Sequence, residues 1–201
     1  MNPPGRPREF DPEVVLDAAV DAFWHHGYAG TSMADLEQAT GLKKGSLYKA
    51  FGDKHTLFQL SLQRYFEKQM AAHVPTFLGA PTATEGVRAF MEWALERGAC
   101  PNGTNRGCMA VNSVNELAQD DPVVQGMLQA ALMRMLGVLT GMIERGQASG
   151  EFRTDVDAAS LAEYLFTINA GFVIHEKGDF PRVGTTSLVD VALSALEAKG
   201  A

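Results

Sequence analysis

The chain has 201 residues, of which 46% are hydrophobic and 20% are charged, and this balance excludes an intrinsically disordered protein. No apolar stretch approaches the roughly 20 residues of a membrane-spanning helix, and no apolar segment follows the basic N-terminus as in a secretory signal. We therefore expect a cytoplasmic protein with no membrane partner. The net charge of −7 does not exclude nucleic-acid binding, because the sign of the contacting face matters more than the sum.

Helical signals dominate the first part of the chain, whereas strand signals are nearly absent. Asp11 and Pro12 supply an N-cap and a first-turn proline, and Gly27 is expected to stop that first helix. The pattern Ser32-x-x-Asp35 fits a capping box at the start of a second helix. The first four helices are thus predicted near residues 12–27, 32–41 and 44–50, and from 53 onward.

The second part of the chain continues the helical pattern. Residues 73–82 contain two prolines and a glycine, and we expect them to end the fourth helix. Thr82-x-x-Glu85 is another capping box, and Asp121-Pro122 opens the longest predicted helix. Later helices are predicted near residues 83–95, 108–118, 122–146, 161–172 and 188–196. The sequence therefore predicts an all-α fold of about nine helices in two domains, residues 1–55 and 56–201, which the fourth helix could bridge.

Residues 31–51, TSMADLEQATGLKKGSLYKAF, predict two helices joined by a tight turn at residues 41–43. Such a pair can place its second helix in the major groove of DNA while the first helix crosses the backbone. Leu47 and Phe51 are expected to face the core, which leaves the polar side chains of the second helix for a duplex. The candidate DNA-binding residues of this region are Thr31, Lys43, Lys44, Gly45, Ser46, Tyr48, Lys49 and Lys54.

Different roles are expected within this set. Lys44 and Ser46 can reach base edges, whereas Tyr48 and Lys49 suit phosphate. Thr31, at a helix N-terminus, can hold a phosphate through its hydroxyl and the amides there. From the residues alone an alternative stays open, because solvated side chains on any pair of antiparallel helices give the same pattern.

The run from Val15 to Leu57 resembles the DNA-binding domain of the TetR (tetracycline-repressor) family. The motifs that carry the resemblance are Gly30-Thr31, Leu47-Tyr48 with Phe51, and Lys54. The resemblance implies a DNA-binding regulator, typically a repressor that leaves its operator when a small molecule binds. The chain departs from the family pattern at two positions: Lys43 replaces a small N-capping residue, and Ala50 replaces a histidine or an aromatic residue.

The N-terminal segment Gly5-Arg6-Pro7-Arg8 resembles the core of an AT-hook. Its prolines keep the chain extended, so that Arg6 and Arg8 could enter a narrow minor groove beside the helix-turn-helix. The alternative is an unstructured tail, which is the common state of chain termini. We include both arginines among the candidate DNA-binding residues.

The resemblance further implies that residues 56–201 form a ligand-binding domain whose last two helices assemble a homodimer. Apolar residues at near-heptad spacing and a final helix with two apolar faces fit such an interface. The candidate interface residues are Leu161, Leu165, Ile168, Phe172, Leu188, Val191 and Ala195. A two-fold dimer would present its recognition helices to the two halves of a pseudo-palindrome.

An effector pocket is the least constrained prediction. Apolar and aromatic residues with one or two polar anchors are typical of such cavities, although plain core packing explains the same residues. The candidate ligand-binding residues are Phe90, Trp93, Cys108, Met109, Asn112, Met127, Met135 and Tyr164. The chemistry of the effector stays unknown at this stage.

Cys108 carries the most specific hypothesis about the effector. It follows Arg106 at the expected start of a helix, where amide dipoles and a guanidinium favour the reactive thiolate. The block from Gly107 to Asn112 also resembles a TetR subgroup that contains electrophile-sensing repressors. Cys100 could act as a resolving partner. The alternative is that both cysteines are ordinary reduced thiols and that Cys108 is a small buried side chain.

No sequence motif indicates catalysis, so we predict that the chain is not an enzyme and needs no cofactor or metal. Nucleophile elbows, phosphate-binding loops, zinc-protease helices and dinucleotide fingerprints are missing. His25 and His26 are adjacent, and neighbouring residues on a helix point apart. Two alternatives to a repressor remain open: a transcriptional activator, and a helical protein-interaction module without a ligand response.

Overall fold

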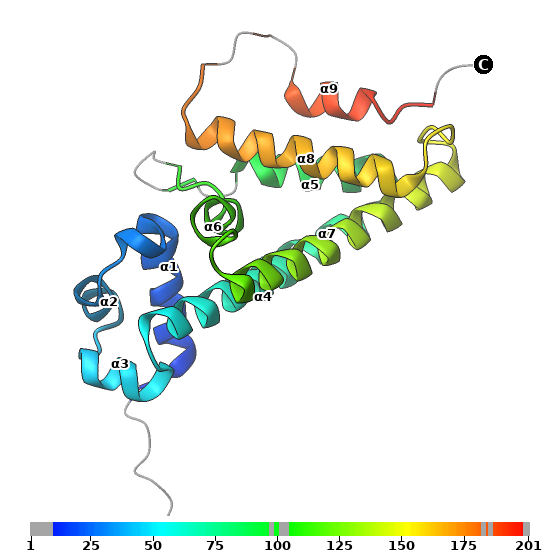
Figure 1. The fold of residues 1–201 in the computed structure, drawn as a ribbon. Coiled ribbons are helices and arrows are strands. Elements are labelled where there is room, and N and C mark those ends of the chain that lie inside the picture. The colour runs from blue at the N-terminus through cyan, green and yellow to red at the C-terminus, as the bar shows by residue number, and fades with distance from the viewer. Residues whose placement is uncertain (1–9, 97–98, 101–104, 182–183, 185–186, 199–201) are drawn as a thin grey trace, which may run out of the picture. The chain divides into compact units, whose positions relative to one another are not determined.

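The computed structural model describes residues 10–96, 99–100, 105–181, 184 and 187–198. These residues form nine helices and two isolated bridges but no strand, which confirms the predicted all-α fold (Figure 1). The helices are α1 (Pro12–Gly30), α2 (Met33–Thr40), α3 (Lys44–Phe51), α4 (Lys54–Gly79), α5 (Ala83–Glu96), α6 (Met109–Leu117), α7 (Pro122–Ser149), α8 (Ala158–Lys177) and α9 (Leu188–Ser194). The chain divides into two compact units, residues 1–65 and 66–201, and the division falls within α4.

In the first unit, α1 begins as predicted but extends further than predicted. The Asp11 side chain accepts a hydrogen bond from the Glu13 amide at 2.9 Å, and Pro12 occupies the first turn. At Gly27 the backbone turns to φ 74° and ψ 176°, yet helical structure resumes and reaches Gly30. The expected stop at Gly27 is therefore a kink inside the helix.

Aromatic packing holds α1 against α4 in this unit. Phe23 meets Phe58 edge to face at 5.1 Å between ring centroids, and Trp24 meets Tyr65 in the same way at 5.0 Å. Arg64 of α4 adds an ion pair by donating from Nε to an Asp17 carboxylate oxygen at 3.0 Å. These contacts provide a rigid base for the short helices α2 and α3.

Helix α4 ends within residues 73–82, as the sequence predicts, but it does not end at the first proline. The helix passes through Pro75 and continues to Gly79. Two tertiary contacts outweigh the proline: Phe77 is 1% exposed within the core, and the Arg145 guanidinium donates to the Leu78 carbonyl at 3.2 Å. Packing and side-chain capping thus stabilise a helical turn that intrinsic propensity disfavours.

The second unit is built on α5, α7 and α8, which contact one another, while α6 packs on α7 and α9 on α5 (Figure 1). Its core contains Phe90, Leu139, Leu165 and Phe172, all buried. By length and composition α7 could cross a membrane, contrary to the expectation from sequence. The helix contacts α5, α6 and α8, and its residues Leu139, Met142 and Ile143 are buried in the core.

Two close contacts fix the junction between α5 and α7. Gly146 lies where a Cβ would approach the Phe152 ring to 2.1 Å, so only glycine fits. The Glu151 carboxylate accepts hydrogen bonds from the Thr84 amide at 2.8 Å and the Thr84 hydroxyl at 2.9 Å at the start of α5. Those bonds, the amide bond first, lower the pKa of Glu151 to about 2, so the carboxylate is charged at neutral pH.

Candidate functional site

The candidate DNA-binding surface is formed by α3. Leu47 and Phe51 are buried and anchor the helix, as the sequence predicts. The predicted contact residues of this helix and its N-cap are exposed: Lys43, Lys44, Gly45, Ser46, Tyr48 and Lys49. One face of α3 thus holds the fold while the other is available to a partner.

The turn before α3 has well-defined geometry. Gly41 adopts the left-handed conformation with φ 70° and ends α2, and its amide donates to the Glu37 carbonyl at 3.0 Å. The predicted capping box of Ser32 and Asp35 is present, and its hydrogen bonds, the Ser32 side-chain bond first, lower the pKa of Asp35. The turn therefore sets a defined orientation of α3 against α2.

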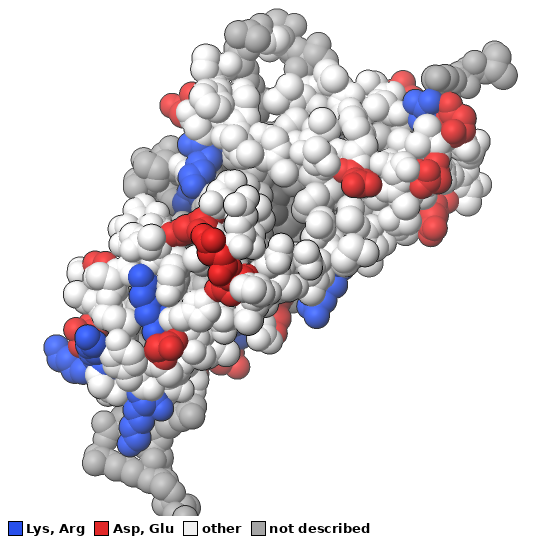
Figure 2. All heavy atoms as spheres, viewed as in Figure 1, with Lys and Arg blue, Asp and Glu red and all other residues white. Residues whose placement is uncertain are grey.

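Positive charge gathers around α3, as Figure 2 shows for the face it displays. The Lys44 ammonium lies 5.6 Å from the centroid of the Tyr48 ring, within range of a cation–π contact. On the following helix the Lys54 ammonium lies 4.4 Å from the centroid of the Tyr28 ring. These contacts restrain the lysine side chains near the surface where phosphates would lie, and restraint lowers the entropy that binding must remove.

Thr31 has a different place from the one predicted. Its side chain is fully buried, and its hydroxyl donates to the Gly27 carbonyl at 2.6 Å. The N-cap of α2 is instead Ser32. The Thr31 hydroxyl is therefore not presented to a phosphate. It stabilises the kink in α1 because it satisfies the backbone carbonyl of Gly27.

Arg6 and Arg8, the predicted minor-groove residues, lie outside the described residues.

Comparison with family models matches both parts of the chain. Residues 15–60 match the model described as bacterial regulatory proteins, tetR family, and residues 83–177 match the tetracyclin repressor-like C-terminal domain. The chain belongs to the TetR family. Membership in a family of regulatory proteins confirms the prediction of a regulator rather than an enzyme.

Individual TetR-family relatives support the assignment along most of the chain. The HTH-type transcriptional repressor ComR of Escherichia coli is 33% identical, with 85% of this chain and 81% of ComR covered. The uncharacterized regulator YezE of Bacillus subtilis is 28% identical over 96% of this chain and 100% of its own. A cysteine mutant of the TetR family regulator CifR, complexed with 26-bp operator DNA, superimposes with a TM-score of 0.81 at 31% identity, covering 96% of this chain and 100% of that chain.

The predicted ligand-binding residues of this TetR-family chain do not share one environment. Phe90, Met109 and Met135 are buried, Trp93, Asn112 and Met127 are half-buried, and Tyr164 is 41% exposed. Phe90 and Trp93 do lie together, with ring centroids 6.0 Å apart. Tyr164 lies on the exposed face of α8, in one row at helical spacing with the exposed Thr167 and Gly171.

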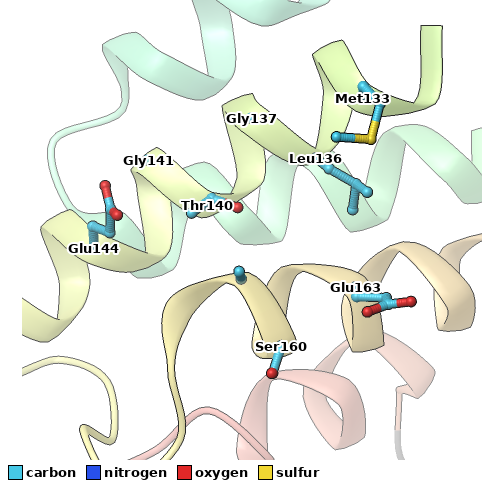
Figure 3. Close-up of a pocket in the computed structure, with 9 residues that line it drawn as sticks. Met133, Leu136, Gly137, Thr140, Gly141, Glu144, Ser160 and Glu163 are labelled. Carbon is cyan, nitrogen blue, oxygen red and sulfur yellow. The ribbon is translucent and has the colours of Figure 1, made fainter. Parts of the chain in front are cut away.

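A groove of about 440 Å³ runs between α7 and α8 (Figure 3). It is lined by Met133, Leu136, Gly137, Thr140, Gly141, Glu144, Ala159, Ser160 and Glu163. None of the predicted ligand-binding residues is among them. The groove is open to solvent, whereas the sequence predicts an apolar cavity with one or two polar anchors lined by other residues.

The predicted dimer-interface residues separate into two groups. Leu161, Leu165 and Phe172 are buried within the core of the unit, so a partner cannot reach them. Val191 is 54% exposed, while Ile168, Leu188 and Ala195 are half-buried. The exposed face of α8 carries Tyr164, Thr167, Gly171 and Ile174. The sequence analysis assigned none of these four residues to the dimer interface and named Tyr164 as a ligand-binding candidate, because apolar residues occur on several sides of this helix.

Cys108 is the N-cap of α6 and is 3% exposed, whereas Cys100 is half-buried. A polar bridge joins the start of α6 to the end of α8. The Lys177 ammonium donates to the Asn112 side-chain oxygen at 2.7 Å. The side-chain amide nitrogen of Asn112 donates to the Arg106 backbone carbonyl at 3.0 Å. Asn112 therefore serves a structural bridge next to Cys108.

Proposed function

We propose that this TetR-family regulator is a repressor that binds a pseudo-palindromic operator as a homodimer and is released by a small-molecule inducer. The observation that carries the proposal is the division of α3 into a buried face and an exposed cationic face. Leu47 and Phe51 anchor the helix, while Lys44, Ser46 and Lys49 are exposed. This arrangement suits insertion into the major groove, with ammonium groups on phosphates and shorter groups toward bases.

Related proteins support the repression and operator-binding parts of this proposal. ComR is named as a transcriptional repressor, and CifR forms a complex with double-stranded operator DNA. A target on the bacterial chromosome would place the protein in the cytoplasm. The similarity to CifR extends over 96% of this chain, so it includes the second unit as well as the DNA-binding unit.

The exposed face of α8 is the surface we propose for the dimer. Tyr164 and Ile174 are 41% and 52% exposed, and Thr167 and Gly171 lie between them on the same face. Val191 of α9 adds a further exposed apolar side chain. A two-fold dimer would hold the recognition helices about 34–36 Å apart, one turn of B-DNA.

For the inducer we propose a thiol-reactive molecule that acts on Cys108. The buried sulfur has little free space, so a covalent adduct would have to displace the start of α6. That movement would break the bridge between Lys177 and Asn112, which links α6 to α8.

Operator binding is tested by selecting duplexes from a random pool with the purified chain and measuring affinity by fluorescence anisotropy. We expect a pseudo-palindromic site, bound roughly 1,000-fold more tightly than random DNA, with affinity that falls as salt rises. Sequence-independent binding, or none at low salt under reducing conditions, would refute the proposal.

The inducer is tested by alkylating the protein–operator complex with N-ethylmaleimide. We expect release of the wild-type protein and retention of Cys108→Ser, with Cys100→Ser as the control that still dissociates. Operator binding that survives complete alkylation of Cys108 would disprove thiol induction without affecting the DNA-binding proposal.

A further inference from the structure

The start of α3 lacks the cap that such a helix normally has. Lys43 occupies the N-cap position with an extended backbone, φ −68° and ψ 148°, and its side chain makes no capping hydrogen bond. A lysine ammonium has only donors, so it cannot accept from the amides of the first turn. An uncapped helix of eight residues would fray at the end where it is expected to contact DNA.

Glu37 supplies the missing acceptor from the neighbouring helix. The Lys44 amide donates a hydrogen bond to the Glu37 carboxylate, seven residues earlier in the chain. The carboxylate thereby satisfies the first amide of α3, and its negative charge is favourable at the positive end of the helix. The cap of α3 thus comes from α2 instead of from position 43.

The same residue also holds the other end of the turn. The Glu37 backbone carbonyl accepts from the Gly41 amide at 3.0 Å, the bond that ends α2. Glu37 therefore contacts the last turn of α2 through its backbone and the first turn of α3 through its side chain. Its two hydrogen bonds span the whole turn of the helix-turn-helix.

We infer that Glu37 is a positioning residue of the recognition helix, which caps α3 across the turn and so allows a lysine at position 43. This inference rests on the proposed operator binding. Lys43 and Lys44 can then both present cations at the start of the helix, where a capping serine or asparagine would otherwise occupy position 43. Because the Glu37 carboxylate accepts from the Lys44 amide, that amide is not available to a DNA phosphate.

The test is a double-mutant cycle of Glu37→Ala and Lys43→Ser in the full chain, with Gln38→Ala as the exposed control on the same helix. Loss of a cap is expected to weaken affinity for the selected operator about five-fold per recognition helix, and so about 25-fold for two helices. Lys43→Ser supplies a hydroxyl that restores a local cap, so in that background Glu37→Ala is expected to cost less than about two-fold. Gln38→Ala is expected to leave affinity unchanged.

Amide hydrogen exchange at Lys44 in the DNA-free protein provides a second readout. Glu37→Ala is expected to speed exchange at this amide, and adding Lys43→Ser is expected to slow it again. Equal affinity losses in both backgrounds, or unchanged exchange at Lys44, would overturn the inference. If the wild-type chain binds no operator, the proposed function fails, and the exchange data alone still decide whether Glu37 caps α3.

Discussion

In the first unit the polar side chains of α3 point into solvent, whereas in the second unit polar side chains turn inward and hold helix ends together. Lys44 and Lys49 are exposed on a helix that Leu47 fixes from behind. Glu151, by contrast, accepts hydrogen bonds from Thr84 at the start of α5. The comparison indicates that substitutions of the exposed residues of α3 should change binding without changing stability. Substitutions at helix junctions of the second unit should do the reverse.

The largest expected effect is the replacement of Gly146 by alanine. The added Cβ would approach the Phe152 ring to 2.1 Å, so the free energy of unfolding of the second unit should fall by about 2–3 kcal/mol. The matched control is Gly141→Ala on the same helix, where no atom lies within 4 Å and stability should hold or rise.

Denaturant unfolding followed by Trp93 fluorescence, in a Trp24→Phe background, measures the stability of the second unit alone. Equal stabilities of the Gly146 and Gly141 variants would show that the junction between Gly146 and Phe152 is looser than the structure indicates.

Replacing Lys44 by methionine tests the exposed face of α3. We expect operator affinity to fall about tenfold, equivalent to about 1.4 kcal/mol, and the unfolding free energy to stay within about 0.5 kcal/mol. Fluorescence anisotropy and thermal unfolding give the two quantities. Lys68→Met, which removes the same charge from an exposed position of α4, should leave affinity nearly unchanged; an equal loss in both variants would indicate a general charge effect.

Glu151→Gln should destabilise the second unit in a pH-dependent manner, by roughly 1 kcal/mol at pH 7 after allowance for its partial exposure. The folded pKa of about 2 lies below the ordinary 4.5, so the stabilisation is complete above about pH 5 and is lost as the pH falls toward 2. Denaturant unfolding at several pH values should show the two proteins converging in acid. Glu163→Gln on the exposed side of α8 is the control, and a difference that is constant with pH would contradict this role of Glu151.

Arg64→Met should have the smallest effect, a slight fall in the stability of the first unit. The Arg64 ion pair with Asp17 spans α4 and α1 at 3.0 Å, but the Asp17 side chain is 36% exposed and solvent screens the pair. Trp24 fluorescence in a Trp93→Phe background reports this unit, because Trp24 packs on Tyr65. A loss of stability as large as that expected for Gly146→Ala would mean that the pair is more important than its exposure suggests.

Local patterns in the sequence predicted the first unit well. The capping box at Ser32, the left-handed Gly41 and the buried Leu47 all follow from neighbours a few residues away, and the structure contains each of them. The burial of Thr31 could not be predicted in this way, because it depends on the kink at Gly27. The cap from Glu37 had one indirect signal, namely that Lys43 cannot cap its own helix.

The second unit was less predictable because its features depend on contacts between distant residues. Helix α4 continues through Pro75 because Phe77 packs in the core and Arg145 reaches its last carbonyls. Helix α8 is apolar on nearly every side, so its sequence does not distinguish the buried Leu165 from the exposed Ile174. The residues of an effector pocket stay a prediction for the same reason.

The most direct test of the central claim, that α3 enters the major groove twice per dimer, is methylation protection of the selected operator by the wild-type protein. We predict two patches of guanine N7 protection in the major groove, about 10 base pairs apart from centre to centre, and both should weaken for Lys44→Met. A single patch, or protection that does not change when Lys44 is replaced, would contradict the claim.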